Sequence, residues 1–179
     1  FSILVLVSIY WWIHTIVCVL IKFTSKGPIF FKQKRVGRGG QEFYCIKFRT
    51  MSVNGSGIEG NGEITKIDDN RITRLGAFLR KTNLDELPQF LNVLNGEMSV
   101  IGPRPHMIDE DHAVAEKLRK YRIRRFVRPG ISGWAQINGF RGGTEDMELM
   151  QKRVDYDIKY IESWTPWLDI KIIYFTILQ

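Results

Sequence analysis

Two adjacent carboxylates are the side chains of this sequence best placed to do chemistry. Asp85 and Glu86 lie in the segment 82–89 (TNLDELPQ), at the start of a helical pattern. A carboxylate near a helix N-terminus stays ionised, so one acid can attack a phosphorus atom while its neighbour binds a metal ion. A structural interpretation competes with this one, because Asn83 and Glu86 have the spacing of a capping box. The two acids alone do not decide between these interpretations.

Several cationic side chains accompany the acids. They lie beside predicted strand ends, helix ends or loops and are Lys47, Arg49, Arg80, Arg104 and Arg141. Arg104 stands between two prolines, which is a rigid mount for a guanidinium that binds phosphate. Each cation alone is better explained as a surface salt-bridge partner. Together with two carboxylates, they are what transfer of a phosphoryl group from a diphosphate requires.

Other catalytic signatures are missing from the sequence. It has no P-loop, GxGxxG, CxxC, GxSxG or HExxH motif, and His14, His106 and His112 lack metal-ligand spacing. These patterns disfavour Rossmann oxidoreductases, Ser-His hydrolases and metal hydrolases, and the histidines are predicted to be structural. The two cysteines, Cys18 and Cys45, are not expected to form a disulfide, which favours a reducing environment.

The N-terminal segment has the composition of a membrane helix. Residues 1–21 carry no charge, whereas 26 basic and 19 acidic residues occupy the rest of the chain. Twenty-one helical residues extend about 31 Å, one hydrocarbon core, and the basic residues that follow indicate a cytoplasmic side. By length and charge alone the segment predicts a spanning helix, with a buried core helix as the alternative. A purely cytosolic enzyme and a polytopic transporter are both disfavoured.

The rest of the chain predicts a mixture of strands and helices. The predicted strands are 29–35, 42–50 and 98–101, the first two forming a hairpin around the glycines of 37–40, and the predicted helices are 72–79, 87–94, 109–125 and 145–163. Segment 129–138 is predicted to be a structured loop, and the glycine-rich segment 54–62 either a lid or a surface insertion. The aromatic segment 164–178 suits a membrane interface.

The net charge of +7 indicates an anionic partner. A dense basic cluster at 117–125 is either a solvated helix face or a contact for anionic lipid headgroups, worth about 1 kcal/mol per basic residue. Nucleic acid is not expected as a partner, because the basic residues accompany a membrane-grade segment and no reading module is visible.

Six motifs in order turn these separate signals into a resemblance. They are the apolar N-terminal segment, SKGPIFFKQ (25–33), KFRTM (47–51), LDELPQ (84–89), GPRP (102–105) and PGISGWAQ (129–136). In this order they resemble the bacterial sugar transferase family, the monotopic phosphoglycosyl transferases, over essentially the whole chain. The resemblance implies an enzyme that moves a hexose-1-phosphate from a UDP-sugar to undecaprenyl phosphate, releases UMP and initiates exopolysaccharide, capsule or O-antigen synthesis.

The resemblance also implies an architecture. It is an α+β fold with a re-entrant membrane helix over 1–23 and a catalytic domain over 24–179, which ends in an interfacial helix, on the cytoplasmic face of the bacterial inner membrane. One departure stands out, because the family's Ser-Pro helix break is absent and no proline precedes Pro28. Membrane lipids with anionic headgroups are expected partners. The sequence leaves open whether the chain forms a homo-oligomer.

Roles for individual residues follow from the same resemblance. Asp85 is expected to attack the β-phosphorus and form a sugar-phosphoryl aspartate, and Glu86, with Asp85, to hold Mg²⁺. Lys47, Arg80 and Arg104 match family positions near the phosphates, and Arg49, Arg141 and Asp157 are further substrate-binding candidates. The segments 139–142 (GFRG), 152–154 (KRV) and 156–157 (YD) resemble the glucose-1-phosphate branch, so UDP-glucose is the first expectation and UDP-galactose the second. A catalytically inactive, membrane-anchored scaffold module is the alternative.

Overall fold

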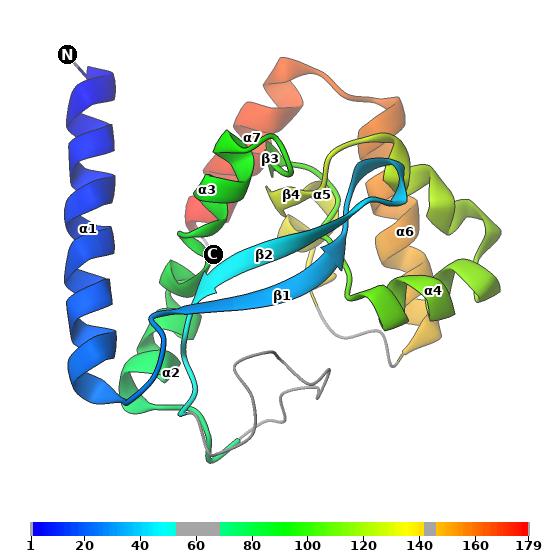
Figure 1. Ribbon diagram of the computed structural model, residues 1–179. Coiled ribbons are helices and arrows are strands. Elements are labelled where there is room, and N and C mark those ends of the chain that lie inside the picture. The colour runs from blue at the N-terminus through cyan, green and yellow to red at the C-terminus, as the bar shows by residue number, and fades with distance from the viewer. Residues whose placement is uncertain (1, 53–68, 142–145, 179) are drawn as a thin grey trace. The chain divides into compact units, whose positions relative to one another are not determined.

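The computed structural model describes residues 2–52, 69–141 and 146–178 (Figure 1). Its elements, in chain order, are α1 (Ser2–Thr24), β1 (Phe30–Val36), β2 (Glu42–Phe48), α2 (Arg74–Lys81), α3 (Gln89–Leu94), β3 (Ser99–Ile101), α4 (Ile108–Lys117), β4 (Gly130–Ser132), α5 (Trp134–Ile137), α6 (Met147–Glu162) and α7 (Pro166–Leu178). Shorter 3₁₀ segments occur at Arg38–Gly40, Leu84–Glu86 and Arg119–Phe126. The predicted mixed α+β class is confirmed for these residues. The predicted loop 54–62 lies outside them.

The chain forms two compact units. Residues 1–33 and 45–89 make the first unit, and residues 34–44 and 90–179 make the second. The β1–β2 hairpin is shared, because the base of each strand belongs to the first unit and the tip to the second.

The hairpin follows its prediction closely, and both strands end within two residues of the expected limits. At its turn, the amide of Gly37 donates to the carbonyl of Gln41 at 2.8 Å. Gly39 and Gly40 have φ angles of 69° and 81°, in the left-handed region that glycine enters without strain. The glycine run therefore marked the turn for a conformational reason.

In the first unit, α1 packs one face against the hairpin and α2. Val17 and Ile21 are buried with Phe48 of β2 and Leu79 of α2 in one hydrophobic cluster. The remaining surface of α1 exposes large apolar side chains, namely Trp11, Trp12, Ile16, Val19, Leu20 and Phe23. Although apolar length predicted a spanning helix, no helix in the described ranges has both the length and the apolarity needed to cross a membrane.

A close approach fixes α2 against the end of β2. Thr73 caps the helix, its Oγ1 accepting from the amide of Gly76 at 2.9 Å. A Cβ on Gly76 would lie 1.9 Å from the carbonyl oxygen of Thr50, far inside van der Waals contact. Only glycine lets α2 come this close to the chain that leaves β2.

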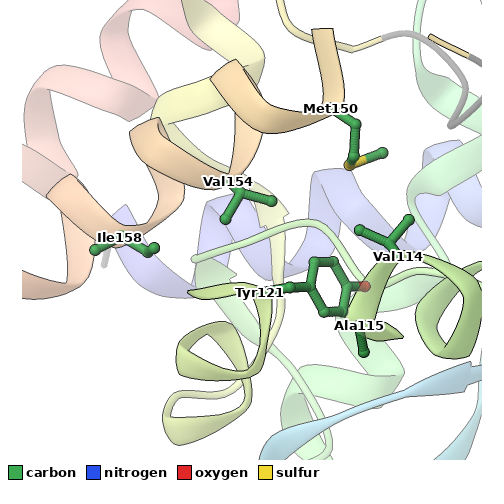
Figure 2. Packing of buried hydrophobic residues seen from close by; sticks show 6 residues of the cluster. All are labelled: Val114, Ala115, Tyr121, Met150, Val154 and Ile158. Atoms are coloured by element: carbon green, nitrogen blue, oxygen red, sulfur yellow. The ribbon is translucent and has the colours of Figure 1, made fainter. Parts of the chain in front are cut away.

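The core of the second unit lies between α4, the 3₁₀ segment 119–126 and α6. Its buried members are Val114, Ala115, Tyr121, Met150, Val154 and Ile158, which Figure 2 shows side by side. Tyr121 is fully buried, and its ring carries a hydroxyl into an otherwise apolar cluster. A hydroxyl in such a place needs hydrogen-bond partners.

Two predictions for the second unit are wrong. The predicted helix 109–125 ends at Lys117, because Leu118 is extended (φ −116°, ψ 100°), and a 3₁₀ segment follows. The predicted loop 129–138 contains β4, which pairs in parallel with β3, and α5. The main chain of β4 lies very close to the residue that follows β3, since a Cβ on Gly130 would lie 2.1 Å from the amide nitrogen of Gly102.

Candidate active site

Asp85 and Glu86 lie on a 3₁₀ turn, Leu84–Glu86, between α2 and α3. Asn83 precedes it in the left-handed conformation, with φ 55° and ψ 13°, and reverses the chain as it leaves α2. The side chain of Asn83 makes no capping hydrogen bond, so the capping-box interpretation is wrong. Both acids are half-buried and precede α3 instead of occupying its first turn.

The turn geometry separates the two carboxylates. A 3₁₀ turn has three residues, so neighbouring side chains diverge by about 120°. Asp85 and Glu86 are therefore unsuited to sharing one proton. The backbone of this turn therefore suits the two carboxylates to different roles in a reaction.

Glu86 is held by a lysine from the hairpin. Lys47 Nζ donates to Glu86 Oε1 at 2.6 Å, and the two side chains are only 20% and 14% exposed. Lys47 is fixed in turn because the next residue, Phe48, is buried in the core of the first unit. The structure thus joins the predicted cation to the predicted acid by a charge-assisted hydrogen bond, the stronger kind.

The other two predicted cations of the first unit stabilise the chain around β2. Arg80, in the last turn of α2, donates from Nε to Thr50 Oγ1 at 2.8 Å. Arg49 is buried, and its terminal nitrogens donate to the carbonyls of Ser25 and Lys26 at 2.8 and 2.7 Å. Burial lowers the pKa of Arg49. Arg49 thereby fastens the end of β2 to the chain that follows α1, and its contact with substrate stays a prediction.

The remaining predicted residues belong to the second unit. The main-chain carbonyl of Arg104 accepts from Arg124 Nη2 at 2.6 Å, and Arg124 Nε donates to Asp157 Oδ2 at 2.8 Å. Arg124 and Asp157 are both buried, so Asp157 meets an arginine in the interior. Burial favours the neutral form of Arg124, but Asp157, Tyr121 and Asp111 together outweigh it and raise the pKa of Arg124. Arg141 is exposed and follows Phe140.

A buried histidine beside this pair was predicted only as structural. His106 is 3% exposed and has ring nitrogens close to Tyr121, Arg124 and Arg153. Burial lowers the pKa of His106 well below its ordinary value, and the charges of Arg124 and Arg153 lower it further. The sequence placed Arg124 only in the basic cluster 117–125 and Arg153 only in the segment 152–154. The prediction of a solvated or lipid-facing side chain is wrong for Arg124, which is buried, and the place of both arginines beside His106 was missed. Arg153 carried a signal, because it shares the apolar face of α6 with buried Met150 and Val154.

The expected Mg²⁺ can be compared with the donors that the site offers. No group of three or more His, Cys, Asp and Glu side chains suited to a metal occurs in the described part of the chain. Mg²⁺ is often held by one or two carboxylates together with substrate phosphates. The half-buried Asp85 and Glu86 fit that donor set, and the ion remains a proposal.

A comparison with known protein families shows the class of protein to which this chain belongs. A model described as "Bacterial sugar transferase" matches residues 1–179. The chain belongs to the bacterial sugar transferase family, an enzyme family.

The chain is also similar in sequence to individual proteins whose names state an activity. The chain is similar to the UDP-glucose:undecaprenyl-phosphate glucose-1-phosphate transferase of Xanthomonas campestris pv. campestris, with 47% identity over 169 residues, 94% of this chain and 35% of the relative. It is 44% identical over 165 residues to the protein of that name in Escherichia coli K12, covering 91% of this chain and 35% of the relative. A UDP-N-acetylgalactosamine-undecaprenyl-phosphate N-acetylgalactosaminephosphotransferase of Aeromonas hydrophila is 41% identical over 160 residues, 89% of this chain and 37% of the relative. The chain spans about a third of the length of these relatives.

Proposed function

We propose that this chain moves a hexose-1-phosphate from a UDP-sugar to undecaprenyl phosphate, releases UMP and so initiates a surface glycan. The observation that carries the proposal is the 3₁₀ turn that holds Asp85 and Glu86 side by side, with Glu86 paired to Lys47. The names of the relatives support the acceptor and the UDP-linked donor. Glucose is the first candidate for the sugar and galactose the second.

The reaction proceeds in two displacements at one phosphorus. A carboxylate oxygen of Asp85 attacks the β-phosphorus of the UDP-sugar, and the bond from that phosphorus to the bridging oxygen breaks. The electron pair leaves with UMP, and a sugar-phosphoryl aspartate remains. A phosphate oxygen of undecaprenyl phosphate then attacks the same phosphorus, returns the carboxylate of Asp85 and yields the lipid-diphosphate sugar. This sequence is covalent catalysis by a carboxylate.

The neighbouring side chains prepare the site for that attack. Lys47 holds Glu86 at 2.6 Å and keeps it from competing with Asp85 for phosphorus. We propose that Lys47, Arg80 and Arg104 supply positive charge for the diphosphate. Mg²⁺, when bound by Glu86 and Asp85, would neutralise further charge on the phosphates.

We propose that the chain works on the cytoplasmic face of the bacterial inner membrane. The acceptor in the names of the relatives is a lipid phosphate, which resides in a membrane. Side chains such as Trp12 and Phe23 of α1 and Trp167 of α7 are 71%, 88% and 78% exposed. Apolar surface on this scale is typical of membrane contact, and we propose re-entrant insertion for α1 and interfacial contact for α7. Exposed Arg119 and Lys120 suit anionic headgroups.

The decisive experiment incubates the membrane-embedded chain with undecaprenyl phosphate and a panel of UDP-sugars and measures UMP. UMP release with UDP-glucose, and loss of release in Asp85→Asn, would support the proposal. Asp155→Asn is the matched control, because Asp155 is an exposed acid on α6 and should retain full activity. Absence of UMP with every donor would favour the inactive scaffold instead.

A further inference from the structure

The second unit contains a connected set of buried polar side chains that the proposed chemistry does not use. His106, Tyr121, Arg124, Arg153 and Asp157 are each at most 7% exposed. Figure 2 shows Tyr121 of this set among the apolar side chains of the core. Burying charged groups is unfavourable unless they are paired and hydrogen-bonded, so such a set is expected to have a specific arrangement.

The hydrogen bonds of Tyr121 define the tautomer of His106. Asp111 pairs with Arg125, so its carboxylate is ionised and can only accept, and it accepts from the Tyr121 hydroxyl at 2.8 Å. The hydroxyl has one hydrogen, so Tyr121 must accept from His106 Nδ1, 2.7 Å away. Arg124 Nη1 also approaches Nδ1, but at 3.4 Å, beyond the usual range of a hydrogen bond, so the short contact with Tyr121 decides the tautomer. His106 is therefore protonated on Nδ1.

The other ring nitrogen of His106, Nε2, must then accept a hydrogen bond. Arg153 Nη1 lies 3.1 Å from His106 Nε2, and a guanidinium can only donate. Protonation of Nε2 would place two donors face to face beside a positive charge. A neutral His106 thus connects Tyr121 on one side to Arg153 on α6 on the other.

This chain of hydrogen bonds ends on the two loops that carry predicted substrate-binding arginines. His106 directly follows the GPRP segment, 102–105, in which Arg104 lies. Arg35 donates to the carbonyl of Pro105 at 3.2 Å, next to the Arg124 bond to Arg104. Arg153 donates from Nε to the carbonyl of Phe140, the neighbour of Arg141, at 2.9 Å.

We propose that His106, held between Tyr121 and Arg153, is a positioning residue that acts through the main chain of 102–105 to set Arg104 for the UDP-sugar. Through Arg153 it also holds the chain beside Arg141. The inference rests on the proposed function, because it assigns Arg104 to the donor substrate. It also explains why Asp157 is buried: Asp157 orients Arg124, which holds the carbonyl of Arg104.

The test removes one hydroxyl and compares two buried tyrosines. Tyr121→Phe deletes the acceptor of His106 without changing the shape of the ring. Tyr160→Phe is the matched control, because Tyr160 is 5% exposed in the same unit and donates to Asp169 at 2.8 Å, away from His106. We expect Tyr121→Phe to raise the Kd for UDP-glucose and lower kcat/KM at least fivefold, and Tyr160→Phe to change either less than twofold.

The same substitution made in the Arg104→Ala variant distinguishes a positioning role of Tyr121 from a loss of folded protein. If Tyr121 acts through Arg104, the loss caused by Tyr121→Phe should shrink below twofold in Arg104→Ala. Equal losses in both backgrounds, or equal effects of the two tyrosine variants, overturn the inference. Should Tyr121→Phe fail to fold, His106→Gln takes its place in the same comparison. Wild type that binds UDP-glucose without UMP release contradicts only the proposed function, and wild type that does neither contradicts both.

Discussion

The ion pair between Lys47 and Glu86 can be tested by removing its cation. Lys47→Met keeps the apolar stem and deletes the charge, while Glu86→Gln neutralises the partner. The donor–acceptor distance is 2.6 Å and both side chains are at most 20% exposed, so solvent screens the pair weakly. A hydrogen bond between charged groups contributes about 1.5–3 kcal/mol in such a place. We therefore expect a coupling energy of about 2 kcal/mol from the double-mutant cycle.

A second pair on the same hairpin supplies the control. Lys34 and Glu42 are 3.2 Å apart, but their side chains are 51% and 49% exposed. A solvated pair of this kind is worth about 0–1 kcal/mol, so the cycle of Lys34→Met and Glu42→Gln should give a much smaller coupling. Urea unfolding of all variants in the same detergent measures both cycles.

Activity gives a second readout of the same perturbation. We expect Lys47→Met to lower the initial rate of UMP release at least tenfold, or about 1.4 kcal/mol, because Glu86 loses its partner and the phosphates lose a cation. Lys34→Met should leave that rate unchanged. Equal coupling energies in the two cycles, together with a normal rate in Lys47→Met, would refute the idea that this lysine organises the acid turn.

Four further predictions address the nucleophile, the phosphate contacts, the buried histidine and the packing of α2. Asp85→Asn should abolish turnover while UDP-sugar still binds. Wild type without acceptor should gain a sugar-phosphate on the peptide that contains Asp85, and initial rates with both substrates should follow ping-pong kinetics. Sequential kinetics with no adduct would exclude the covalent route. Arg104→Lys should reduce the rate about tenfold because the guanidinium fork is lost, whereas Arg119→Ala should mainly weaken vesicle binding, and equal small effects would remove Arg104 from the site. The lowered pKa of His106 means that the unfolded state binds more protons than the folded state below pH 6.5, so the free energy of unfolding should be fully retained above that pH. Below it, the free energy should fall by up to about 1.4 kcal/mol per pH unit until the folded-state pKa is reached. The variant His106→Gln should lack this component in acid titrations of unfolding. Gly76→Ala should destabilise the fold by about 1–3 kcal/mol in urea, because its Cβ would overlap the carbonyl of Thr50, and unchanged stability would contradict the close approach.

The elements with local signals could be predicted from the sequence. The hairpin was predictable because two of its turn glycines adopt positive φ, and the helix over 145–163 because its apolar face repeats with helical period. The break at Leu118 had no such signal. Helical periodicity continues through it, and the 3₁₀ geometry that follows instead places Tyr121 and Arg124 on one buried side.

In the candidate site, residue types could be predicted from the sequence, but tertiary contacts could not. Glu86 and Lys47 could each be singled out by residue type, but their ion pair joins positions 39 residues apart and depends on how β2 meets the turn. Asp157 pairs with Arg124 inside the second unit, and its predicted contact with substrate stays a prediction. Buried charge pairs of this kind depend on tertiary packing, which no local pattern encodes.

The shared hairpin has a consequence for the order in which the chain is synthesised. All residues of the first unit, including the acid turn, have been made once residue 89 is added, but the tip of the hairpin belongs to a unit that needs residues 90–179. At about 5–20 residues per second, the ribosome needs roughly 5–20 s to supply them. During that interval Val36 and Phe43, both buried in the complete fold, lack their packing partners. Ribosome-arrested chains in which residue 89 has just left the exit tunnel should therefore be cut by protease at 34–44, while the base of the hairpin resists.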